Sequence, residues 1–330
     1  MPKIEALTNS VFSVNGETAF NRVALEVFRY QYKNNVVYNR YVNFLNRDIN
    51  KISHYRQIPF LPVEFFKNHK VVAGNFTPRA VFTSSGTTGM SFSRHLVADL
   101  YLYERSFVKG FEHFFGPVKD YVFLALLPSY LEREGSSLIY MAQKLITLSG
   151  HAESGFYLNE YEQLSRLLSK LKALNKKTVL LGVTYALLDL AEEFPVEFPD
   201  LIIMETGGMK GKRKEMVREV LHKKLSAAFG VEKIYSEYGM TELLSQAYSK
   251  GNGLFETPPW MKIVIRDTND PLSLLPENKT GGVNIIDLAN IYSCSFIETK
   301  DLGKLHASGQ FEILGRFDDS DVRGCNLLVG

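Results

Sequence analysis

From residue 80 onward, short apolar runs alternate with segments whose apolar residues recur at helical spacing. The runs at 80–83, 121–127, 178–181, 201–204 and 233–235 have the length of strands. Helices are predicted after Asp99 as an N-cap, after an Asn159–Glu162 capping box, and over 214–229. Strands that alternate with helices predict an α/β fold, in which a mainly parallel sheet is flanked by helices.

The two ends of the chain show different patterns. Residues 18–50 carry apolar side chains at helical spacing, which predicts a helix there. Beyond residue 260, short strands are predicted at 262–266, 282–287, 295–299 and 311–314. We therefore expect a helical N-terminal cap region (1–79), an α/β core (80–258) and a smaller β-rich subdomain (259–330).

Composition narrows the class of protein. The chain has 330 residues, of which 45% are hydrophobic, enough for a sizeable core. Its 38 basic and 36 acidic residues give a net charge of +2, so nucleic acid is not an expected partner. The N-terminus has no apolar signal-like stretch and the apolar runs are too short to span a bilayer, so we expect a cytoplasmic protein without membrane insertion. Two cysteines, Cys294 and Cys325, predict neither a zinc site nor a disulfide framework.

A glycine- and hydroxyl-rich run follows the strand at 80–83. Gly86 and Gly89 let the backbone approach an anion closely, so that N–H groups can point at phosphate oxygens. Met90 stands where a Walker A loop would carry lysine, which excludes that motif. A phosphate-binding loop is predicted, with a plain turn as the alternative. Its hydroxyl side chains are Ser84, Ser85, Thr87 and Thr88.

A second polar run, 236–242, follows the strand at 233–235. Tyr238 offers a flat ring for a purine, Thr241 a hydroxyl for phosphate, and Glu242 a hard oxygen ligand suited to Mg²⁺. The loop at 83–89 and the turn at 206–208 also follow strands. Because ligands gather beyond the carboxyl ends of parallel strands, we expect these segments to share one site.

The order of four segments resembles the adenylate-forming superfamily of acyl- and aryl-CoA synthetases, peptide-synthetase adenylation domains and luciferases. The segments are 82–89, 235–242, 299–303 and 315–319, and the resemblance spans roughly residues 80 to 324. More narrowly, the segments 58–62, 128–133, 205–208 and 321–326 resemble the acyl-protein synthetase subunit of bacterial fatty-acid reductase complexes.

The resemblance implies an ATP-dependent acid–thiol ligase with ATP and Mg²⁺ as cofactors. A fatty or other apolar carboxylic acid would be activated as acyl-AMP, captured as a thioester on Cys325, and delivered to a partner acyl reductase. Catalytic roles fall to Cys325, to Glu242 as the metal ligand and to Arg316, whose fork suits ribose or α-phosphate. The residues implied in nucleotide binding are Ser84, Ser85, Gly86, Thr87, Thr88, Gly89, Gly207, Gly208, Tyr238, Gly239, Thr241, Asp301, which would bind ribose, and Arg316.

The chain departs from the superfamily pattern in two places. Ser91 and Phe92 stand where most members carry Pro-Lys, and the chain reaches Gly330 soon after Arg316, so no counterpart of the lid-domain lysine is expected. Two other functions stay open. One is an acyl- or aryl-CoA ligase of the phenylacetate type, and the other is a catalytically degenerate nucleotide-binding scaffold subunit. The length of the acyl chain, the partner and the oligomeric state are not determined by the sequence.

Overall fold

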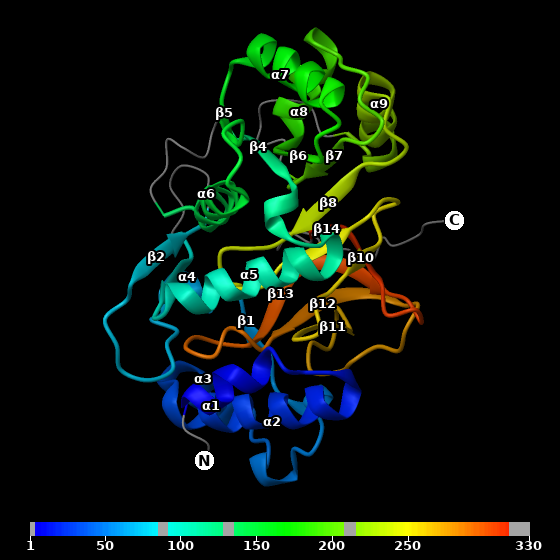
Figure 1. The fold of residues 1–330 in the computed structure, drawn as a ribbon. Coiled ribbons are helices and arrows are strands. Elements are labelled where there is room, and N and C mark those ends of the chain that lie inside the picture. The colour runs from blue at the N-terminus through cyan, green and yellow to red at the C-terminus, as the bar shows by residue number, and fades with distance from the viewer. Residues whose placement is uncertain (1–3, 85–91, 128–134, 208–215, 317–330) are drawn as a thin grey trace. The chain divides into compact units, whose positions relative to one another are not determined.

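The computed structural model describes residues 4–84, 92–127, 135–207 and 216–316 (Figure 1). These residues form two compact units. The first unit contains 4–79, 92–98 and 259–316, and the second contains 80–84, 99–127, 135–207 and 216–258. The first and last described residues therefore belong to the same unit.

A parallel sheet forms the centre of the second unit. β4 and β6 are buried at every position, which explains why their sequences are continuous apolar runs. Beyond β8 the next two strands run antiparallel. The predicted α/β fold with a parallel core is confirmed. In spatial order the strands are β5 (Gly155–Tyr157), β4 (Val122–Leu126), β6 (Thr178–Gly182), β7 (Ile202–Glu205), β8 (Tyr235–Tyr238), β9 (Ala247–Ser249) and β10 (Phe255–Glu256); β2 (Ala80–Thr83) also belongs to this unit.

Side-chain caps begin two helices of this unit, at Asp99 and Ser136, and are absent from its other three helices in the described residues. Asp99 caps its helix as predicted, since its carboxylate accepts from Tyr101 N at 2.9 Å. The predicted Asn159–Glu162 capping box is wrong. Glu160 precedes the helix instead, and its carboxylate accepts from the backbone N–H groups of Leu158 and Asn159. The helices are α5 (Leu100–Phe115), α6 (Ser137–Ser149), α7 (Tyr161–Ala173), α8 (Thr184–Glu193) and α9 (Arg218–Phe229).

An antiparallel sheet forms the centre of the first unit. Its strands, in spatial order, are β11 (Met261–Arg266), β12 (Thr280–Asp287), β13 (Phe296–Leu305) and β14 (Phe311–Arg316), and β1 (Leu61–Pro62) lies parallel to β13. The short strands predicted beyond residue 260 are therefore present. The same unit holds β3 (Arg94–Val97), α1 (Ile4–Val11), α2 (Gly16–Asn34), α3 (Val36–Phe44) and α4 (Phe65–Asn68). Across the described ranges, every helix is too short or too polar to cross a lipid bilayer.

The single helix predicted over 18–50 is broken at Asn35. Its buried side chain accepts from Tyr38 N at 3.0 Å, which starts α3. Its amide also donates to Ser293 O at 3.0 Å. Because asparagine can bond to backbone groups in this way, it ends one helix and caps the next.

Gln31 ties α2 to the turn before β13. The side chain is fully buried, and its Nε2 donates to Asn290 O and Ile291 O, each at 2.9 Å. Its Oε1 accepts from Ser295 N at 3.0 Å. The side-chain amide of Gln31 thus forms hydrogen bonds with three backbone groups in the interior of the protein.

Replacing Gln31 with Leu should lower the free energy of unfolding by about 3 kcal/mol, because it leaves these backbone groups buried without partners. Denaturant unfolding measures the change. Gln143→Leu, at an exposed position of α6, is the matched control and should change the stability little. Equal stability of the two variants would contradict the assigned role.

Candidate functional site

Two of the predicted segments lie at neighbouring strand ends of the second unit. β7 ends at Glu205 and β8 at Tyr238, and the two strands pair in parallel with Glu205 opposite Ser236. The turn after β7 passes through Gly207, whose φ of 71° favours glycine. The 236–242 segment and the 206–207 turn therefore leave the same edge of one sheet, where ligands of such sheets bind.

Glu205 supports this edge from within the sheet. Its carboxylate is 7% exposed and accepts from Thr184 Oγ1 at 2.8 Å and from Ser236 Oγ. Burial raises the pKa of Glu205, while these hydroxyl donors oppose the rise. The bonds join β7, β8 and the first turn of α8. Glu205 belongs to the 205–208 segment singled out in the sequence. Its hydrogen bonds to the Thr184 and Ser236 hydroxyls were not predicted, because they depend on the pairing of β7 with β8 and on the position of α8.

The 236–242 segment presents the residues expected to hold a nucleotide. The Tyr238 ring lies 6.0 Å from the ring of Phe255, edge to face. Thr241 is half-buried and Glu242 is only 4% exposed. Ser84 is half-buried just beyond β2. Ser85, Gly86, Thr87, Thr88, Gly89 and Gly208 lie outside the described residues.

Glu237 is a polar residue of this segment that the sequence reasoning missed. Burial raises the pKa of its carboxyl to about 8, so the group is mostly neutral at pH 7. A Cβ atom on Gly239 would lie 2.5 Å from Glu237 Oε1. Glycine at 239 therefore leaves room for the Glu237 carboxyl beside the backbone.

Asp301 and Arg316 come together in the first unit. They face each other across β13 and β14, with Arg316 Nε 3.3 Å from Asp301 Oδ1. The Arg316 side chain is 68% exposed, so this pair adds little to stability and leaves the guanidinium accessible. The Asp301 amide donates to Thr299 Oγ1 at 3.0 Å, which fixes the backbone at this position.

Of the two cysteines, Cys294 lies within the described residues. Cys294 is buried, and burial raises the pKa of its thiol to about 12. A thiol of that kind is a poor nucleophile. Cys325, the predicted acyl acceptor, lies outside the described residues.

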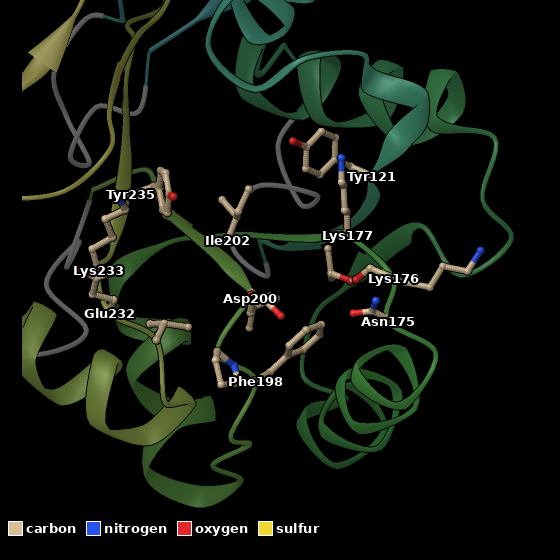
Figure 2. Close-up of a pocket in the computed structure, with 14 residues that line it drawn as sticks. Tyr121, Asn175, Lys176, Lys177, Phe198, Asp200, Ile202, Glu232, Lys233 and Tyr235 are labelled. Carbon is tan, nitrogen blue, oxygen red and sulfur yellow. The ribbon is translucent and has the colours of Figure 1, made fainter.

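A depression of about 520 Å³ lies at the opposite edge of the parallel sheet (Figure 2). Thr178, Ile202 and Tyr235, which begin β6, β7 and β8, are among the residues that line it. Lys177 lies over the Tyr121 ring at 5.8 Å and Lys233 over the Tyr235 ring at 5.7 Å. None of the predicted site residues lines this depression, so it is distinct from the nucleotide motifs.

Several solved structures share this fold. ATP-bound MatB from Rhodopseudomonas palustris is 18% identical with a TM-score of 0.55, and the match covers 72% of this chain and 48% of that one. 2-Hydroxyisobutyryl-CoA ligase with 2-HIB-AMP and CoA is 12% identical with a TM-score of 0.63, covering 93% and 72%. The same ligase in the postadenylation state with R3-HIB-AMP is 13% identical with a TM-score of 0.59, covering 92% and 68%.

The chain spans about half the length of the MatB chain that it matches. No protein-family model and no curated protein matches the sequence. Likeness at these identities shows the fold alone, so what this chain shares with MatB and with 2-hydroxyisobutyryl-CoA ligase is their α/β fold. The predicted fold is thereby confirmed, while the resemblances to the adenylate-forming superfamily and to acyl-protein synthetases stay predictions.

The raised pKa of Glu237 predicts a dependence of stability on pH. The folded state keeps a proton that the unfolded chain releases near pH 4.3, so stability falls as pH rises from there to about 8. Glu237→Gln, which mimics the neutral acid, should raise the melting temperature at pH 9 by about 4 °C or more. At pH 5 it should change little.

Thermal unfolding over this pH range measures the effect. Glu232→Gln, at an exposed position just before β8, serves as the matched control and should follow the wild-type profile. If Glu237→Gln also followed that profile, Glu237 would be charged in the folded protein.

Proposed function

We propose that this chain is an adenylate-forming ligase that activates a carboxylic acid with ATP and transfers the acyl group to a thiol. The observation that carries the proposal is the position of Tyr238 at the end of β8 and of Thr241 and Glu242 just beyond it, in a fold shared with ATP-bound MatB. In the first step, a carboxylate oxygen of the acid attacks the α-phosphorus of ATP and pyrophosphate leaves. In the second step, a thiolate attacks the acyl carbon of acyl-AMP and AMP leaves.

The described residues have groups suited to positioning a nucleotide. The Tyr238 ring can stack on the purine, and the hydroxyls of Ser84 and Thr241 can donate to phosphate oxygens. Asp301 can accept from the ribose hydroxyls, and the exposed guanidinium of Arg316 can reach the ribose or α-phosphate. Holding the reacting groups and placing positive charge near the phosphorus lower the barrier to transfer.

Glu242 fits a Mg²⁺ ion that arrives with ATP. Magnesium is commonly held by one or two carboxylates together with substrate phosphates and water. Within the described parts of the chain, no group of three or more His, Cys, Asp or Glu side chains could hold a metal ion. Bound Mg²⁺ would neutralise phosphate charge.

We propose Cys325 as the thiol acceptor, a fatty or other apolar acid as the substrate, and an acyl reductase as the partner. The segments that resemble acyl-protein synthetases support this choice, and Cys294 is too deeply buried to compete. The second candidate acceptor is coenzyme A. It is favoured by the fold shared with 2-hydroxyisobutyryl-CoA ligase in complex with 2-HIB-AMP and CoA.

The decisive experiment is carboxylate-dependent exchange of labelled pyrophosphate into ATP. A panel of C4 to C18 and aromatic acids with Mg²⁺ should contain at least one acid that supports exchange. If none does, the scaffold alternative replaces adenylation. A labelled acid then reports whether the acyl group ends on the protein or on coenzyme A.

Glu242→Gln should slow the exchange by about 100-fold or more, since it removes a charged ligand for Mg²⁺ and with it stabilisation of the transition state. Initial exchange rates at saturating Mg²⁺ measure the loss. Glu232→Gln, at an exposed position before β8, is the control and should catalyse exchange at the wild-type rate. Normal exchange by Glu242→Gln would place the metal elsewhere.

Cys325→Ser should leave exchange nearly intact, because adenylation precedes the transfer and does not need the thiol. It should abolish a hydroxylamine-sensitive acyl label on the protein. Mass spectrometry of a digest locates the adduct. Cys294→Ser is the control and should keep the label, and a label that survives in Cys325→Ser would rule out this nucleophile.

A further inference from the structure

Arg266 is a buried cation at the end of β11 that the proposed chemistry does not use. The residue is 2% exposed. Its Nη1 donates to Val283 O at 3.0 Å and to Asn284 Oδ1 at 2.9 Å, and its Nη2 donates to Thr299 O at 2.7 Å. One guanidinium therefore bonds to both β12 and β13.

The neighbouring strand is shaped to receive this side chain. The pairing of β12 with β13 shifts register between Gly282 and Asn284, so the ladder is irregular at Val283. The guanidinium donates to the carbonyl at this irregular position. A Cβ atom on Gly282 would lie 2.4 Å from Arg266 Cζ, so only glycine lets the guanidinium lie against the strand.

Carboxylates offset the cost of burying the charge. Glu298 Oε1 lies 3.4 Å from Arg266 Nε, and the field of Asp301 also favours the charged guanidinium. Burying a charge costs several kcal/mol unless it is paired and hydrogen-bonded. The buried guanidinium is therefore held next to β13 by both hydrogen bonds and carboxylates.

The contacts lead from Arg266 to Asp301 in two steps. Arg266 holds the carbonyl of Thr299, and Thr299 Oγ1 donates to Val283 O at 2.8 Å. The same Oγ1 accepts from Asp301 N at 3.0 Å. Arg266 thus bonds to the backbone two residues before Asp301, whose carboxylate pairs with Arg316.

We propose that Arg266 is a positioning residue for the ribose of the nucleotide, which it serves by fixing β13 at Thr299 and thereby the Asp301 carboxylate. The inference rests on the proposed function, since it takes Asp301 as the group that bonds to the ribose hydroxyls. Arg266 itself does not touch the nucleotide. Its effect should therefore depend on whether the nucleotide has ribose hydroxyls.

The test compares dissociation constants for ATP and 2′,3′-dideoxy-ATP, measured by calorimetry with Mg²⁺. The wild type should prefer ATP by about 10-fold or more, from hydrogen bonds to a charged carboxylate. Arg266→Met should lose most of that preference while its affinity for dideoxy-ATP stays within about 3-fold of the wild type. Asp301→Asn should lose the preference in the same way.

Two further variants guard against a simple loss of folding. Arg266→Lys keeps the positive charge but lacks the planar guanidinium with its several N–H donors, and it should lose part of the preference for ATP. Gly282→Ala displaces the guanidinium from β12 and should do the same. Lys262→Met, which removes an accessible cation from the same strand, should keep the wild-type ratio.

The outcomes separate the inference from the function on which it rests. A wild type that binds neither nucleotide overturns the proposed function, and the inference with it. A wild type that prefers ATP through Asp301, while the Arg266 variants keep the full preference, overturns the inference alone. If the Arg266 variants lose affinity for both nucleotides equally, Arg266 supports the structure in general, and the inference is also overturned.

Discussion

The parallel pairing of β7 with β8 sets Glu205 opposite Ser236, and the candidate site of the second unit depends on that register. Because both strands end within a few residues of this pair, the turn through Gly207 and the segment from Tyr238 to Glu242 leave the sheet side by side. A shift by one residue would reverse which side chains face each side of the sheet. The buried bonds from Glu205 to Thr184 and Ser236 oppose such a shift.

The first unit uses buried polar groups to join its elements. Gln31 bonds to the turn before β13, and Arg266 joins β12 to β13. Such groups are costly unless fully paired, so each tolerates few alternative arrangements of its neighbours. The backbone amide of Asp301 is bonded to Thr299, and its carboxylate is paired with Arg316.

Parts of this arrangement followed from local pattern. The apolar run at 178–181 corresponds to β6, whose residues are all buried, and Asp99 caps α5 through its own side chain. The predicted helix over 18–50 is broken at Asn35, whose side chain caps α3 and also donates to Ser293, 258 residues away. The capping box at Asn159 failed for a local reason, since the adjacent Glu160 takes the backbone amides first.

The sequence by itself determined the parallel-core fold class and which chemical groups stand in each motif, because strand periodicity and short-range spacing are local properties. Tyr238, Thr241 and Glu242 lie close together in the sequence, within 238–242, so their combination is visible without a structure. Only the tertiary structure decided that burial raises the pKa of Glu237 and that Arg266 donates to the carbonyl of Thr299. Desolvation and hydrogen-bond partners depend on what the fold brings around a group, and for Arg266 those partners come from two other strands.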